Sequence, residues 1–77
     1  MSPLKTSSIV TWLKPDGAPV SCFEKIKVLN ENHEELRQMV RDALEDALLM
    51  GCSERQVREV MHALIDEVIP GFNERRD

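Results

Sequence analysis

Apolar residues recur every three or four positions along most of the chain after residue 21. Between Ile26 and Met50 this repeat is unbroken, which is typical of one face of an α-helix. A second repeat runs from Val57 to Val68, shortly before Pro70. The pattern therefore predicts two helices, helix one over about residues 22–50 and helix two over about residues 53–69.

Residues that favour helix ends support these bounds. Ser21 with Glu24, and Ser53 with Gln56, have the spacing of a capping box, in which side chains pair backbone N–H groups left free at a helix start. Gly51 suits the left-handed cap that ends many helices. We therefore expect helix one to open at Ser21, to end at Gly51, and to be followed directly by helix two at Ser53.

The segment least suited to a helix is "NEN", residues 30–32. Asparagine has a low helix propensity, and Asn32 with Glu35 has the signature of a new helix start. A break at this point is the alternative to one continuous helix. Because the apolar repeat passes through these residues without a change of register, we expect helix one to be continuous.

The N-terminal region, residues 1–20, has a different pattern. "KPDGAP" at residues 14–19 combines Pro, Asp and Gly in the order of a tight turn. "SIVTWL" before it is β-branched and aromatic, as strands are, whereas Pro19 after it cannot donate to a strand ladder. The sequence predicts a short β-hairpin or an extended arm here.

Folding helix two back along helix one gives a mainly α protein, an antiparallel helical hairpin over residues 21–70 with a C-terminal tail at 71–77. Val40 would then lie beside Leu64, and helix two would end before it reaches Ile26 and Leu29. These two side chains need a cover, either Trp12 from the same chain or the equivalent segment of a second chain. We therefore expect a homodimer with a four-helix arrangement.

The same reasoning selects the residues that would form the core and the binding surface. They are apolar residues from the three-or-four repeat of each predicted helix, which form a stripe along one helix face, together with the one tryptophan. The predicted binding residues are Trp12, Ile26, Leu29, Leu36, Val40, Leu44, Val57, Met61 and Leu64.

Size and charge narrow the possible functions. A chain of 77 residues forms one domain at most, and a two-helix hairpin buries little surface, which favours association. The net charge of −4 opposes binding to nucleic acid and to anionic membranes. No apolar run is long enough for a membrane span or a signal peptide. We expect a small cytoplasmic protein of bacterial type with reduced cysteines.

The corner at residues 47–57 resembles the helix-turn-helix motif of DNA-binding proteins. A small residue, a glycine, a serine and a branched apolar residue occupy the corresponding positions: Ala47, Gly51, Ser53 and Val57. In that alternative, helix two would read bases through Arg55, Gln56 and Arg58. Acidic residues precede the corner, and Asp46 stands where the motif prefers an apolar residue. We therefore favour an ordinary helical hairpin.

Catalytic and metal sites are not predicted. Cys22 and His33 would lie about 16 Å apart along one helix, which is too far to share a metal ion. Glu59 and His62 have the spacing used by di-metal bundles, but they lie away from the apolar stripe. An enzyme that uses Cys22 as a nucleophile is a third alternative. We expect a non-enzymatic protein without cofactors, which acts by binding itself and other proteins as an adaptor or regulator.

Overall fold

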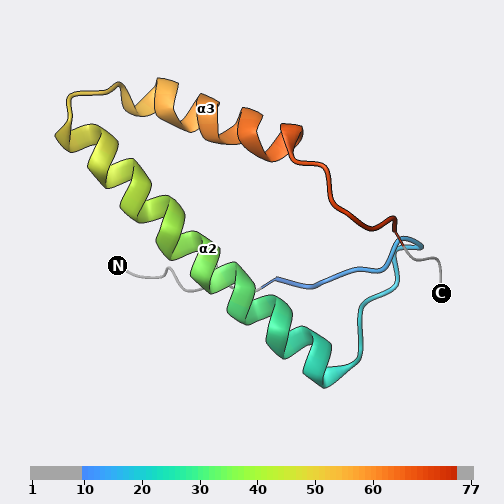
Figure 1. The fold of residues 1–77 in the computed structure, drawn as a ribbon. Helices are drawn as coiled ribbons and strands as arrows, with labels where there is room; N and C mark the ends of the chain where they lie inside the picture. The colour runs from blue at the N-terminus through green and yellow to red at the C-terminus, as the bar shows by residue number, and fades with distance from the viewer. Residues whose placement is uncertain (1–9, 75–77) are drawn as a thin grey trace. The chain divides into compact units, whose positions relative to one another are not determined.

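The computed structural model describes residues 10–74 and is mainly helical. It contains helix α2, Phe23–Leu49, and helix α3, Glu54–Glu67 (Figure 1), and residues 10–74 form no strand longer than an isolated bridge. The chain divides into two units. Unit 1 contains the described residues 10–36 and Glu74, and unit 2 is Arg37–Asn73.

Helix α2 has 27 residues and runs through residues 30–32 without a break. Lys27 donates to Glu31 across this region, with an Nζ–Oε2 distance of 3.0 Å. Such a pair, four residues apart, adds a few tenths of a kcal/mol to a helix. The apolar register was therefore a better guide here than the low helix propensity of asparagine. The predicted arm residues 1–9 and tail residues 75–77 lie outside the described residues.

The predicted capping box at the start of helix one is wrong. The helix begins at Phe23, and its first backbone bond runs from the Ile26 N–H to the Cys22 carbonyl at 3.0 Å. Cys22 therefore occupies the cap position, and Glu24 is the second helical residue instead of the third. Its carboxylate still lies in the first turn, where it interacts favourably with the helix dipole.

The end of α2 is a glycine cap, as predicted. Gly51 has φ +90°, a conformation that costs other L-residues about 1–2 kcal/mol. The Cys52 N–H donates to the Ala47 carbonyl at 2.9 Å, and the Gly51 N–H donates to the Leu48 carbonyl at 3.1 Å. These two bonds define a Schellman motif, which pairs the carbonyls left free at the helix end.

Ser53 caps the start of α3, which confirms the second predicted N-cap. Its Oγ accepts from the Gln56 backbone N–H at 3.1 Å. At its other end α3 stops at Glu67, two residues before the predicted limit, and the Val68 N–H bonds to the Leu64 and Ile65 carbonyls. Pro70 lies just beyond, and the residue before a proline is restricted to extended conformations.

Residues 14–18 form the tight turn that the sequence predicts. The Gly17 N–H donates to the Lys14 carbonyl at 2.9 Å, and the Lys14 N–H donates to the Ala18 carbonyl at 2.8 Å. The Asp16 carboxylate accepts from the Ala18 N–H at 2.9 Å, which is the bond expected of Asp in a turn. Gly17 has φ +90°, so it supplies the left-handed residue that closes such a hairpin.

The two sides of this turn pair only once, through an isolated antiparallel bridge between Leu13 and Pro19. The next bond runs from the Val20 N–H to the Trp12 carbonyl at 2.8 Å. Leu13 and Pro19 therefore face each other between two hydrogen-bonded pairs, where neither N–H is needed. Pro19 is tolerated for this reason, and the pairing is too short to form strands.

None of the residues 10–74 is buried. The best-covered side chains are half-buried, and they form one group in each unit. In unit 1 they are Val10, Trp12, Ala18, Val20, Ile26, Leu29 and His33, and in unit 2 they are Leu44, Ala47, Val57 and Met61.

Candidate interaction surface

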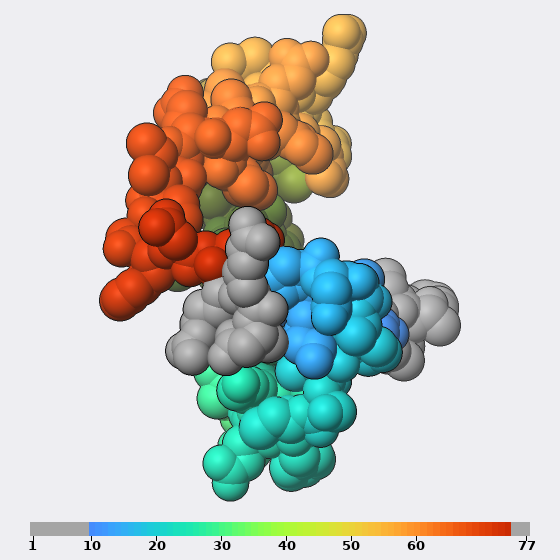
Figure 2. Space-filling model, turned by 90° about the vertical axis from the view of Figure 1, so that its right-hand side faces the viewer, coloured from blue at the N-terminus to red at the C-terminus, as the bar shows by residue number. Residues whose placement is uncertain are grey.

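In unit 1, the arm packs on the N-terminal half of α2 through Trp12. Its indole Nε1–H donates to Asn30 Oδ1 at 2.8 Å. The indole ring also meets the His33 ring edge to face, with ring centroids 6.0 Å apart and an interplanar angle of 78°. Figure 2 shows residues 10–20, in blue, beside the first turns of α2, in cyan. Ile26 and Leu29, on the same stripe, are half-buried.

Asn30 is the residue that the sequence interpretation missed. It was treated only as a weak point of the helix, whereas its side chain accepts the one hydrogen bond that Trp12 can donate. A tryptophan that packs on a protein surface usually finds such a partner. The signal in the sequence is the three-residue spacing of Asn30 and His33, which places a polar acceptor and a ring on one helix face.

In unit 2, four of the apolar stripe residues are half-buried. Leu44 and Ala47 lie on the last turns of α2, and Val57 and Met61 lie on the first turns of α3. All four are close in sequence to the Gly51 cap, where the chain reverses. The helical hairpin therefore covers its apolar side chains only near the turn.

The other three predicted binding residues are exposed. The exposed fraction is 54% for Leu36, 37% for Val40 and 58% for Leu64. Further apolar side chains of unit 2 are exposed with them. These are Met39, Leu48, Leu49, Met50, Val60, Ile65, Val68, Ile69 and Phe72.

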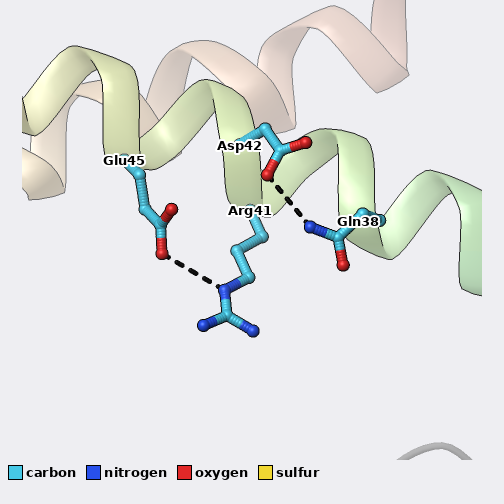
Figure 3. A network of polar contacts seen from close by, with 4 residues as sticks. All are labelled: Gln38, Arg41, Asp42 and Glu45. Atoms are coloured by element: carbon cyan, nitrogen blue, oxygen red, sulfur yellow. Dashed lines mark hydrogen bonds and ion pairs between the residues drawn. The ribbon is translucent and has the colours of Figure 1, made fainter.

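A polar network covers the opposite face of α2 (Figure 3). Arg41 Nε donates to Glu45 at 3.2 Å, and Gln38 Nε2 donates to Asp42 at 3.0 Å. All four side chains lie on one side of the helix, away from the α3 ribbon in the view of Figure 3. Arg41 and Glu45 form an ion pair four residues apart, and both side chains are more than half exposed, so this face is the hydrated side of α2.

The outer face of α3 is also polar. Arg58 donates to Glu54 Oε2 from Nε at 3.0 Å and from Nη2 at 2.9 Å. A shallow hollow on this face is lined by Glu54, Arg55, Arg58, Glu59 and His62. Two of them, Arg55 and Arg58, would read bases in the helix-turn-helix alternative, and the third residue of that alternative, Gln56, does not line the hollow. The carboxylates of Glu54 and Glu59 offset the two arginines, so the face provides little charge for phosphate contacts.

A second hollow, of about 660 Å³, lies at the start of α2. The exposed Cys22 thiol lies in its wall with two lysines, Lys14 and Lys25. The sequence interpretation did not identify these lysines as neighbours of the thiol: Lys14 reaches the helix start only through the turn at residues 14–18, whereas Lys25 is three residues from Cys22 and could have been identified from the sequence.

Within residues 10–74, no group of three or more His, Cys, Asp or Glu side chains has the geometry to hold a metal ion. Neither described helix is long and apolar enough to cross a bilayer. Comparisons with protein-family models, with curated proteins and with solved structures found no match to this chain.

Proposed function

We propose that this chain is a non-enzymatic helical protein that acts by binding protein surfaces, as an adaptor or regulator, and that its first partner is a second copy of itself. In the assembly, each copy contributes two helices to a four-helix arrangement. The arm with Trp12 covers one end of the apolar stripe, and the partner covers the part that the chain leaves exposed.

The observation that supports this proposal is the exposure of the apolar stripes. No side chain among residues 10–74 is buried, and Leu36, Val40 and Leu64 stay exposed although their helical register matches the covered residues. Burying one large apolar side chain stabilises a fold by about 1.5–3 kcal/mol. A short chain has few such side chains to spare, so association provides burial that the hairpin lacks.

Sedimentation equilibrium over a hundredfold range of concentration tests the proposal. We expect a reversible shift toward twice the chain mass of 8.8 kDa. A single 8.8 kDa species over the whole range, with full helix content, would overturn self-association.

A gel-shift experiment separates this function from DNA binding. Mixed genomic DNA at low salt should not be retarded by the protein, and the variant with Arg55→Ala and Arg58→Ala should behave in the same way. Retardation that decreases steeply with salt, and that the double variant loses, would instead indicate a DNA-binding regulator.

A further inference from the structure

One flank of the hairpin in unit 2 carries two exposed methionines. The exposed fraction is 67% for Met39 and 80% for Met50. Successive residues of an α-helix are about 100° apart around its axis, so both methionines lie roughly 90° from the half-buried Leu44 and Ala47. Met50 keeps its helical position, because its N–H donates to the Asp46 carbonyl at 3.1 Å. The methionines therefore form an exposed row beside the stripe that is half-buried near the turn.

The same face of the hairpin includes an apolar residue of α3. Ala43 lies between the two methionines along α2 and is exposed. Val60 lies on the corresponding flank of α3 and is 54% exposed. In an antiparallel pair of right-handed helices, the corresponding flanks of the two helices lie on one face of the pair. Met39, Ala43, Met50 and Val60 therefore form one exposed apolar surface, the methionine face.

The charged residues that border the methionine face are all acidic. Asp42 and Asp46 follow Met39 by three and seven residues, and Glu67 follows Val60 by seven residues. These intervals place the three carboxylates along the flanks that carry the apolar side chains. The arginines of unit 2 lie on the other flank or on the outer face of the helices. They are Arg37, Arg41, Arg55 and Arg58.

The three carboxylates have no cationic partner within residues 10–74. Asp42 accepts a hydrogen bond from the neutral amide of Gln38, and Asp46 and Glu67 form no ion pair in the described part of the chain. Asp42 and Asp46 are also four residues apart on one helix, a spacing at which like charges are destabilising. The methionine face therefore has negative charge that the chain itself does not neutralise.

An amphipathic helix with a basic flank complements this surface in both respects. Its apolar side chains would cover the methionine face, as helices bind in hydrophobic grooves, and its lysines or arginines would pair with the carboxylates. Methionine suits such a site because its flexible, polarizable side chain adapts to the shape of a partner. A second copy of the chain is less complementary, because Arg41 and Arg58 already pair with Glu45 and Glu54.

We infer that the methionine face is the docking site for a basic amphipathic helix of another protein. The inference rests on the proposed adaptor role and names the chemistry of the partner. It does not depend on self-association, because the stripe with Val40 and Leu64, which a second copy would cover, lies on a different side of the helices. The bound helix lies beside both α2 and α3.

Fluorescence anisotropy with a model peptide tests this inference. The probe is a fluorescein-labelled peptide of leucine and lysine, about 18 residues or five helical turns long, with its leucines on one face. Titration with the full-length protein at physiological salt should give a saturable rise in anisotropy. Two control peptides should not bind, one with glutamate in place of lysine and one with the leucines and lysines in scrambled order. No binding of the basic peptide, or equal binding of either control, would overturn the inference.

Two pairs of substitutions test the charges. Asp42→Asn with Asp46→Asn should raise the Kd of the basic peptide about tenfold, because each carboxylate attracts a cation of the bound helix. Glu45→Gln with Glu54→Gln changes the net charge by the same amount away from the methionine face. This control should change the Kd less than about twofold, because distant exposed charges are screened at this salt concentration. Equal effects of the two pairs would mean that the peptide responds only to net charge, which contradicts the site.

The apolar contact is tested on the methionines. Met39→Gln with Met50→Gln should raise the Kd more than about tenfold, because the variant removes most of the apolar surface that the peptide covers. Leu49→Gln is the control, since Leu49 is 87% exposed and lies on the outer face of α2. Unchanged affinity of the methionine variant would overturn the inference. All these side chains are exposed, so each variant should keep the helix content of the parent in circular dichroism.

Sedimentation of the chain without peptide separates this inference from self-association. A dimer that does not bind the basic peptide contradicts the docking site and leaves self-association intact. A monomer that binds the peptide, and loses affinity with Met39→Gln and Met50→Gln, supports the docking site and contradicts self-association.

Discussion

The two ends of α2 are covered in different ways. At its N-terminal end, in unit 1, the contacts come from one large side chain, Trp12. Its indole Nε1–H donates to Asn30 Oδ1 at 2.8 Å, and its ring lies edge to face with the His33 ring. At its C-terminal end, in unit 2, the apolar side chains of Leu44 and Ala47 are half-buried, as are those of Val57 and Met61 on α3. The first arrangement is specific to one residue, whereas the second depends on the general apolar character of two helices and on the turn between them.

This difference has a consequence for the middle of the helix. The Trp12–Asn30 hydrogen bond fixes the arm on α2, and the turn capped by Gly51 fixes the start of α3. Neither contact covers Leu36 or Val40, which stay exposed.

The largest effect is expected from Val40→Asp. In the proposed dimer this change places a carboxylate on the exposed apolar stripe that the partner covers, and burying an unpaired charge costs several kcal/mol. The dissociation constant of the dimer should rise at least about 100-fold, equivalent to roughly 3 kcal/mol. Gln38→Asp, which introduces the same residue on the outer face, should leave the dissociation constant nearly unchanged in sedimentation equilibrium. Equal effects of the two variants would contradict an interface at Val40.

Trp12→Ala removes the anchor of the arm. Large-to-small changes of buried aromatic residues cost about 3–5 kcal/mol, and since Trp12 is only half-buried, we expect a loss of about 2 kcal/mol. Urea unfolding followed by circular dichroism measures it. Trp12→Phe keeps a ring but removes the donor to Asn30, so it should cost only about 1 kcal/mol. If Trp12→Ala unfolds at the same urea concentration as the parent, the arm does not stabilise unit 1.

Gly51→Ala tests the turn in unit 2. Alanine at φ +90° should destabilise the chain by about 1–2 kcal/mol. No atom lies within 4 Å of the position where a Cβ would stand, so the loss has a conformational cause and not a steric one. Gly71→Ala is the matched control, because that site is equally open and its φ is not positive. Its midpoint in thermal unfolding should match that of the parent.

The smallest effect is expected on the outer face of α2. Glu45→Gln removes the charge that pairs with Arg41, and both side chains are more than half exposed. The loss in stability should be only a few tenths of a kcal/mol. Urea unfolding at low and at high salt measures it, and the difference from the parent should shrink as salt increases. A loss above about 1 kcal/mol would mean that this face is not simply hydrated.

The sequence was informative wherever a local rule acts alone. The helix repeat gave the bounds of α2 within one residue, and the conformations required at Gly51 and Gly17 gave both turns. The cap at Ser21 was misplaced by one residue although serine is among the preferred N-cap residues, because the N-cap preference alone does not fix the first residue of a helix. The partner of Trp12 was missed because a contact across 18 residues depends on how the turn directs the arm. No local rule identifies a surface that would bind a partner, so the residues of the proposed surface remain predictions.

The central claim is that folding and association of this chain are coupled, and urea unfolding at two protein concentrations tests it most directly. Because a partner that binds only the folded chain stabilises it by mass action, the midpoint should move to higher urea when the concentration is raised a hundredfold. For a dimer that unfolds to two chains, the expected gain is about 2.7 kcal/mol, the free energy of a hundredfold change in concentration. Superimposable unfolding curves at the two concentrations would contradict the account, because a lone chain would then be sufficient for the fold.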